Sequence, residues 1–131
     1  MKKKLVLIIP IITAIVGFLL FRTVFLIGYI PSESMEPTLK ENSIILGLRT
    51  YGELKTGDIV IFKHDGSLYV KRIAAIPGET IIVEGEKYTV PQDSYFMLGD
   101  NHENSYDSRF WANPYVSLED IVAKIILPVN T

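Results

Sequence analysis

The chain has 131 residues, no cysteine and a formal net charge of −2 at pH 7. This length suits a single small domain, and the lack of cysteine excludes disulfides, thiolate metal sites and a cysteine nucleophile. All 15 acidic residues but only 9 of the 13 basic ones lie after Arg22, so this part carries 9 − 15 = −6. An acidic domain argues against a nucleic-acid partner, which would favour a basic surface.

The N-terminal segment is apolar behind a basic start. Lys2, Lys3 and Lys4 precede an uncharged run from Leu5 to Phe21, and apolar residues continue beyond Arg22. The uncharged run corresponds to about 25 Å of helix, slightly short of a bilayer core of about 30 Å, but a snorkelling arginine lets the span extend past it.

A cleavable export signal would begin in the same way. The apolar part is longer than the usual signal core of about 7–15 residues, and no small-x-small cleavage site follows it. We therefore predict an uncleaved transmembrane anchor over residues 5–27. The lysines favour the cytoplasm for residues 1–4, which places residues 28–131 on the outer side.

Two prolines bracket two serines just after this segment, in Pro31-Ser-Glu-Ser-Met-Glu-Pro-Thr-Leu39. Each proline fixes its own φ and disfavours helix at the preceding residue, which predicts a rigid loop that can hold a serine hydroxyl in one direction. Serine needs a base to take its proton. His64 and His102 lie in a hairpin-like turn and a polar loop, where solvated histidines are common. Lys71, in an otherwise apolar run, is the better candidate for the base that activates Ser34.

The remaining chain consists of short apolar runs separated by turn residues. Asp65-Gly66 and Pro77-Gly78 are typical turn pairs, and helical periodicity is weak throughout. This pattern predicts a mostly β domain, a small antiparallel sandwich or barrel-like fold. The predicted strands cover residues 43–49, 58–63, 68–76, 79–84, 87–90, 94–98 and 120–127.

The most polar stretch runs from Gly99 to Trp111. It does not match a calcium-binding loop, because Ser105 stands where glycine is needed and Trp111 where glutamate is needed. A solvated loop is one interpretation. Asp107 and Arg109, beside two aromatic residues, favour instead a partly buried ion pair that fixes the shape of the loop.

Four stretches in order resemble the bacterial type I signal peptidases, membrane-anchored serine proteases that remove signal peptides from exported proteins. The resemblance covers nearly the whole chain, with Glu33 standing where glycine is common in that family. The stretches are residues 31–39, Gly57-Asp-Ile-Val-Ile-Phe62, Tyr69-Val-Lys-Arg-Ile-Ala-Ala-Ile-Pro-Gly-Glu79 and Gly99-Asp-Asn-His-Glu-Asn-Ser-Tyr-Asp-Ser-Arg109.

The resemblance implies a role for each matching residue. Ser34 is the nucleophile and Lys71 the general base, whose pKa must fall from about 10.4 towards neutrality by burial. Ser32 contributes its hydroxyl, with the Ser34 backbone N–H, to an oxyanion hole. Ser105 orients the lysine amine, and Asp107 and Arg109 form an ion pair that supports the loop. The substrate pockets of this family favour small side chains at the first and third positions before the cut. The residues that match the lining of these pockets are Ile30, Met35, Leu39, Tyr69 and Val70.

The same resemblance implies no metal and no cofactor. The expected partners are signal peptides of exported preproteins and the lipid bilayer, in a single-pass protein of the bacterial cell membrane. Three alternatives remain open from the sequence: a Ser/Lys autoprotease of the repressor type, which the anchor and the acidic domain disfavour; a membrane-tethered assembly factor without enzymatic activity; and a peptidase dedicated to a narrow substrate set.

Overall fold

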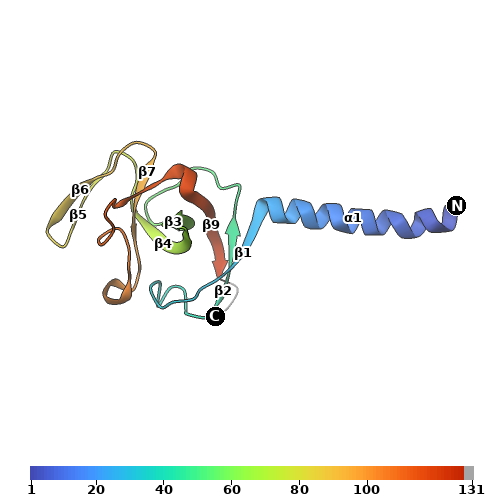
Figure 1. Ribbon diagram of the computed structural model, residues 1–131, viewed down its shortest axis with the longest axis horizontal. Coiled ribbons are helices and arrows are strands. Elements are labelled where there is room, and N and C mark those ends of the chain that lie inside the picture. Colours follow the sequence, from blue (N-terminus) through green and yellow to red (C-terminus); the bar gives the residue numbers. More distant parts are fainter. Residues whose placement is uncertain (129–131) are drawn as a thin grey trace.

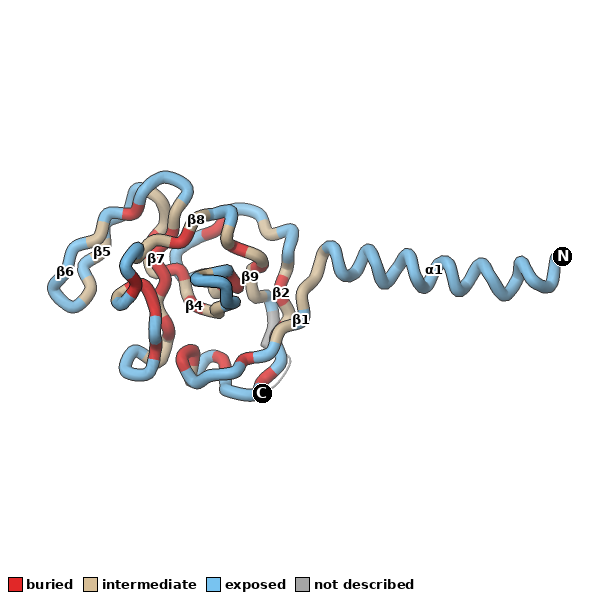
Figure 2. Tube along the Cα trace, viewed as in Figure 1, coloured by how far each residue is buried: buried red, intermediate tan, exposed pale blue. Residues whose placement is uncertain are grey.

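A single long helix leads into a β domain (Figure 1). The structure, a computed structural model, describes residues 1–128, with side chains through residue 126. Helix α1 (Lys2–Val24) projects away from the domain, and every turn of it is exposed except at its C-terminal end (Figure 2). Within the described residues it is the one helix that is long and apolar enough to cross a membrane.

The helix ends three residues before the predicted end of the anchor. Phe25 has extended backbone angles, φ −114° and ψ 153°, and it opens strand β1 (Phe25–Tyr29). This strand was not predicted, because its apolar residues continue the composition of the helix without a turn signal. Pairing with strand β2 (Ile44–Leu48) along the whole of β1 satisfies the backbone groups that a longer helix would have used internally.

The main sheet has seven strands in the order β1-β2-β9-β3-β4-β7-β8, and every neighbouring pair is antiparallel. The mostly β, antiparallel fold is thus confirmed, although the sheet stays open between β1 and β8 and forms no closed barrel within residues 1–128. Its remaining strands are β3 (Ile59–His64), β4 (Ser67–Ala75), β7 (Ser94–Leu98), β8 (Tyr115–Ser117) and β9 (Ile121–Pro128). Two short 3₁₀ turns, η1 (His102–Asn104) and η2 (Leu118–Asp120), complete the described elements.

A two-stranded hairpin of β5 (Thr80–Val83) and β6 (Glu86–Thr89) stands apart from the main sheet. Its two turn residues, Glu84 and Gly85, both have positive φ (52° and 83°), the backbone of the favoured two-residue hairpin turn. Apolar side chains of the hairpin pack against the buried Phe96 of β7 and so attach it to the main sheet.

One cluster of buried apolar side chains lies under the loop of residues 31–39, called here the serine loop. Met35 and Leu39 of that loop are 1% and 2% exposed, and they pack with Ile45 of β2 and Ile61 of β3. Burying side chains of this size stabilises the fold by about 1.5–3 kcal/mol each. The loop is therefore held onto the sheet by its own apolar residues that follow the candidate nucleophile, and the buried Ile30 of the same cluster precedes it.

A second cluster fills the sheet on the β3, β4 and β7 side, around Phe62, Ile73 and Met97. His64 packs against this cluster, because its ring stacks on Trp111, a member of the cluster, with ring centroids 3.9 Å apart. The expectation of a solvated His64 is wrong, because its side chain is only 16% exposed. His102, by contrast, is exposed as expected.

Candidate active site

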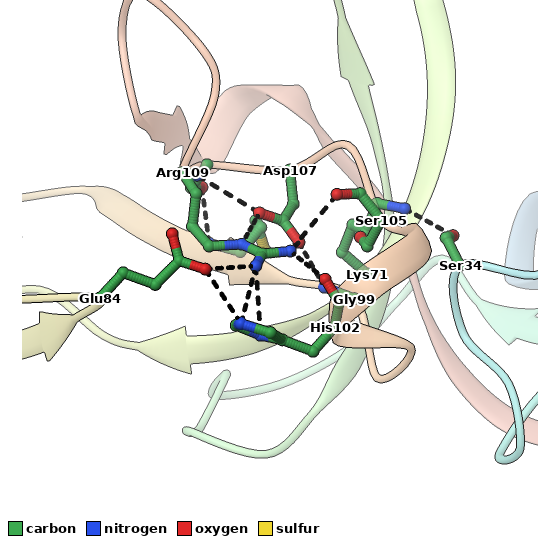
Figure 3. A network of polar contacts seen from close by, with 10 residues as sticks. Ser34, Lys71, Glu84, Gly99, His102, Ser105, Asp107 and Arg109 are labelled. Atoms are coloured by element: carbon green, nitrogen blue, oxygen red, sulfur yellow. Dashed lines mark hydrogen bonds and ion pairs between the residues drawn. The ribbon is translucent and has the colours of Figure 1, made fainter.

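The fold brings Ser34 and Lys71 into contact. Ser34 lies in the loop after β1, and Lys71 is in the middle of β4, paired with Val60 of β3. The Lys71 Nζ is 2.6 Å from the Ser34 Oγ, and the two residues are only 3% and 7% exposed. Figure 3 shows this contact at the side of a larger polar network. A buried amine and a buried hydroxyl at this distance can exchange a proton.

The pKa of Lys71 is lowered from its ordinary value. Burial is the main cause, because it disfavours the charged ammonium; the Arg109 charge acts in the same direction, and the Asp107 charge opposes both. The neutral amine is the form that can accept a proton from serine. Burial in β4 therefore moves Lys71 in the direction that a general base at neutral pH requires.

The loop after β7 ties β4 to the serine loop. Asp100 receives two hydrogen bonds from the Arg72 guanidinium, Nε to Oδ1 at 2.8 Å and Nη2 to Oδ2 at 2.6 Å, and a third from the Thr38 hydroxyl at 2.6 Å. Arg72 immediately follows Lys71, and Thr38 lies near the end of the serine loop. Bidentate pairs of this kind fix geometry as well as adding stability.

The next residue, Asn101, contacts the serine loop directly. Its backbone N–H donates to the Ser34 carbonyl at 2.9 Å, and its side-chain amide donates to the Glu33 carbonyl at 3.1 Å. None of these four residues, Asn101, Asp100, Arg72 and Thr38, was given a role from the sequence. Asp100 and Asn101 lie inside the most polar stretch of the chain, which was a signal, but their partners lie 28 to 68 positions away and are invisible to local patterns.

The predicted ion pair between Asp107 and Arg109 is present and buried. Nε and Nη2 of Arg109 donate to the two carboxylate oxygens of Asp107 at 2.8 and 3.0 Å, and the Gly99 N–H donates to Asp107 at 3.0 Å. Burial opposes ionisation of Asp107, yet the hydrogen bonds from Arg109 and Gly99 outweigh it and hold the pKa of the carboxyl below its usual range.

Arg109 also gathers the surrounding loop. It donates to the His102 and Ser105 carbonyls at 2.8 and 3.3 Å, and it reaches the Glu84 carboxylate of the β5–β6 turn at 3.1 Å (Figure 3). The hairpin is thereby joined to the loop that carries Asn101 and Ser105.

The other two predicted serines lie near the pair. The Ser32 Oγ is 3.3 Å from the Ser34 Oγ, and Ser32 is exposed. Ser105 is buried, and its Oγ has no hydrogen-bond partner among the described residues, so no bond to the Lys71 amine is formed in this geometry. Gly99 packs directly against Ser105 and against the Ser34 carbonyl.

A mostly apolar groove of about 680 Å³ opens beside Ser34 and Lys71. It lies between β1 and the first half of β4. Within residues 1–128, β1 pairs only with β2, and β4 pairs with β7 only from Arg72 onward. Four of the five predicted pocket residues line it: Ile30, Met35, Tyr69 and Val70. Leu39 does not line the groove but packs in the core beneath it. The sequence analysis missed the contribution of β1, including Leu26 and Tyr29, because it assigned most of that strand to the anchor.

No cluster of three or more histidine, aspartate or glutamate side chains in residues 1–128 is placed to hold a metal ion.

Sequence comparison identifies the family to which this chain belongs. A family model described as "Signal peptidase, peptidase S26" matches residues 2–90 and 83–130. The chain belongs to this family. It is 33% identical to the protein named Signal peptidase I of Leptolyngbya laminosa, over an alignment covering 78% of this chain and 68% of that protein. Against Signal peptidase I of Bacillus amyloliquefaciens the identity is 32%, covering 76% and 74%, respectively.

A third relative, the probable signal peptidase I-2 of Synechocystis, is 33% identical over 63% of this chain and 54% of its own length. The chain therefore spans between about half and three quarters of these relatives. The enzyme class expected from the sequence, a serine endopeptidase of the signal peptidase I type, is confirmed by family membership.

Proposed function

We propose that this protein removes N-terminal signal peptides from exported preproteins, with Ser34 as the nucleophile and Lys71 as the general base. The observation that carries the mechanism is the 2.6 Å contact between two buried groups, the Lys71 Nζ and the Ser34 Oγ. The lowered pKa of Lys71, caused mainly by burial, supports the same assignment.

In the first half of the reaction the neutral Lys71 amine takes the Ser34 hydroxyl proton while Oγ attacks the scissile carbonyl carbon. The carbonyl oxygen becomes an oxyanion, which the Ser34 N–H and the Ser32 hydroxyl stabilise. The intermediate collapses with cleavage of the C–N bond, and the Lys71 ammonium returns its proton to the leaving amine, the new N-terminus of the mature protein. The signal peptide stays attached to Ser34 as an ester.

In the second half a water molecule gives a proton to Lys71 and adds to the ester carbonyl. Collapse of this second intermediate breaks the bond to Ser34 Oγ, which recovers the proton from Lys71. The signal peptide leaves with a free carboxyl group, and the enzyme returns to its starting state.

The groove is the proposed site of the signal peptide. Both of its walls present unpaired strand edges, from β1 and from residues 67–71 of β4, and an extended peptide can form backbone hydrogen bonds with such edges. Ile30, Met35, Tyr69 and Val70 would then contact the side chains before the cut.

We propose that α1 anchors the protein, with residues 1–4 in the cytoplasm, the anchor of residues 5–27 shortened to end with the helix at Val24, and the catalytic domain, which includes β1, outside. The groove begins at β1, which directly follows α1, so an anchored domain would hold its active site close to the membrane surface where signal peptides reside. The lipid bilayer is then a partner as well as a location.

The test is cleavage of a preprotein with a small-x-small site by the full-length protein in liposomes. Wild type should cut after that site, while Ser34→Ala and Lys71→Ala should be inactive although thermal unfolding shows that both are folded at the assay temperature. Lys63→Ala, at an exposed lysine of β3, is the matched control and should retain activity. A folded wild type that cuts none of several preproteins would favour a non-enzymatic assembly factor, and a restricted set of cleaved preproteins would favour a dedicated peptidase.

A further inference from the structure

We propose that Asn101 is a positioning residue that orients the Ser34 backbone N–H for the oxyanion. The inference rests on the proposed function, because it concerns the same reaction. Asn101 uses two donors on the two peptide units that flank Ser34: its side-chain amide on the Glu33 carbonyl at 3.1 Å, and its backbone N–H on the Ser34 carbonyl at 2.9 Å.

The Glu33 carbonyl and the Ser34 N–H belong to one planar peptide unit. In a trans peptide the C=O and N–H point in opposite directions, so a donor that holds the oxygen also sets the direction of the hydrogen. The same carbonyl accepts a second hydrogen bond from the Glu36 N–H at 3.0 Å. With two donors on this oxygen, the peptide unit can rotate only by breaking one of them.

The Ser34 N–H itself has no acceptor among the described residues. It is therefore available to a ligand. Its strength as a donor depends on the hydrogen bonds that the Glu33 carbonyl, at the other end of the same peptide unit, accepts. Hydrogen bonds in a chain polarise one another by about 10–30% per bond, so donation to the Glu33 carbonyl strengthens the Ser34 N–H as a donor.

The surrounding contacts hold Asn101 in place. Asp100, its neighbour, is held by Arg72 and Thr38, and the Asn101 carbonyl accepts the Asn104 N–H at 3.0 Å. The side-chain contact goes to a backbone oxygen, so it does not depend on the glutamate side chain at position 33. Asn101 thus connects the loop after β7 to the oxyanion donor without touching the reacting atoms.

The experiment compares Asn101→Ala and Asn101→Asp in the full-length protein, assayed on a preprotein in detergent. At neutral pH the Asp variant fills the same space but faces the Glu33 carbonyl with a carboxylate oxygen, so repulsion replaces donation. We expect kcat to fall by about 10- to 100-fold for Asn101→Ala and further for Asn101→Asp, with KM within about twofold, because losing one whole oxyanion donor costs about 10²–10³.

Two further readouts separate orientation from general stability. A peptide aldehyde carrying the residues before the cut forms a tetrahedral adduct on Ser34, and its affinity should fall by the same factor as kcat/KM. The pH at half-maximal rate, which reports Lys71, should stay unchanged in Asn101→Ala, which adds no charge. Asn104→Ala and Asn104→Asp, at an exposed asparagine of the same loop, are matched controls and should stay within about twofold of wild type.

The proposal is overturned if Asn101→Asp keeps the wild-type kcat, if it is more active than Asn101→Ala, or if the loss lies entirely in KM. It is also overturned if both variants are unfolded at the assay temperature, since Asn101 would then serve the fold. An inactive wild type would instead refute the proposed function, so the two failures are distinguishable.

Discussion

Replacing Gly99 by alanine should separate the nucleophile from its base. A Cβ at this position would lie 2.0 Å from the Ser105 Oγ, 2.5 Å from the Ser105 Cβ and 2.6 Å from the Ser34 carbonyl oxygen. In a close-packed interior the Ser34 carbonyl must recede by at least about 0.4 Å, and the Ser105 Oγ by about 1 Å, before either reaches 3.0 Å. Gly99 does not have a positive φ, so the cost is steric alone.

We expect Gly99→Ala to destabilise the protein by about 1–3 kcal/mol, as overpacking usually does. It should lower kcat by about 10- to 100-fold, because the Ser34 carbonyl must move by at least about 0.4 Å and a displacement of about 1 Å can cost about 100-fold. Preprotein cleavage and thermal unfolding measure the two effects. Gly52→Ala is the matched control, because no heavy atom lies within 4 Å of its would-be Cβ.

A double variant tests the cause. Adding Ser105→Gly to Gly99→Ala removes the two contacts with the Ser105 side chain but leaves the one with the Ser34 carbonyl. Stability should partly return while activity stays low. Wild-type activity and stability in Gly99→Ala, or full activity in the double variant, would refute the reasoning that Gly99 sets the position of Ser34.

Three further predictions concern the charged groups around the site. At pH values between the lowered pKa of Lys71 in the native state and its ordinary pKa, the unfolded chain carries a proton on Lys71 that the native state lacks, so the free energy of unfolding should rise with pH. Lys71→Met should remove this rise in urea denaturation between pH 7 and 10. An unchanged slope in this variant would contradict the assignment. Asp107→Asn leaves the buried Arg109 without its charged partner and should cost about 3–5 kcal/mol in the same assay, whereas a cost under 1 kcal/mol would mean that Glu84 compensates. Arg72→Lys keeps the charge but loses the two-point contact with Asp100, and it should cost about 1–3 kcal/mol; equal stability would show that the charge alone suffices.

Much of the β domain was predictable from local pattern. The hairpins at Asp65-Gly66 and Glu84-Gly85 follow from turn residues that tolerate positive φ, and the strands between them from short apolar runs. Strand β1 was not predictable in this way. Its residues are as apolar as the helix before them, and only pairing with β2 determines that the helix stops at Val24.

The residues of the groove and of the surrounding site likewise fall into two groups, those that the sequence could identify and those that it could not. Residues that carry the family resemblance, such as Ser34, Lys71 and the pair of Asp107 with Arg109, could be named from the sequence. Leu39 was assigned to the groove and lies beneath it, because sequence position does not reveal which face of a loop a side chain takes. Asn101 and Arg72 could not be assigned roles, since their partners come from distant parts of the chain.

The amino-acid sequence specifies the chemical groups and the local shapes: a basic start before an apolar helix, prolines that stiffen a serine loop, turns that form hairpins, and a lysine within an apolar strand. How these groups act together depends on the packing of the whole domain. Packing of the serine loop against the sheet brings Lys71 and Ser34, 37 positions apart, to 2.6 Å, and burial of the lysine lowers its pKa. Burial and non-local distance are properties of the packed chain, because each depends on residues that no local pattern brings together.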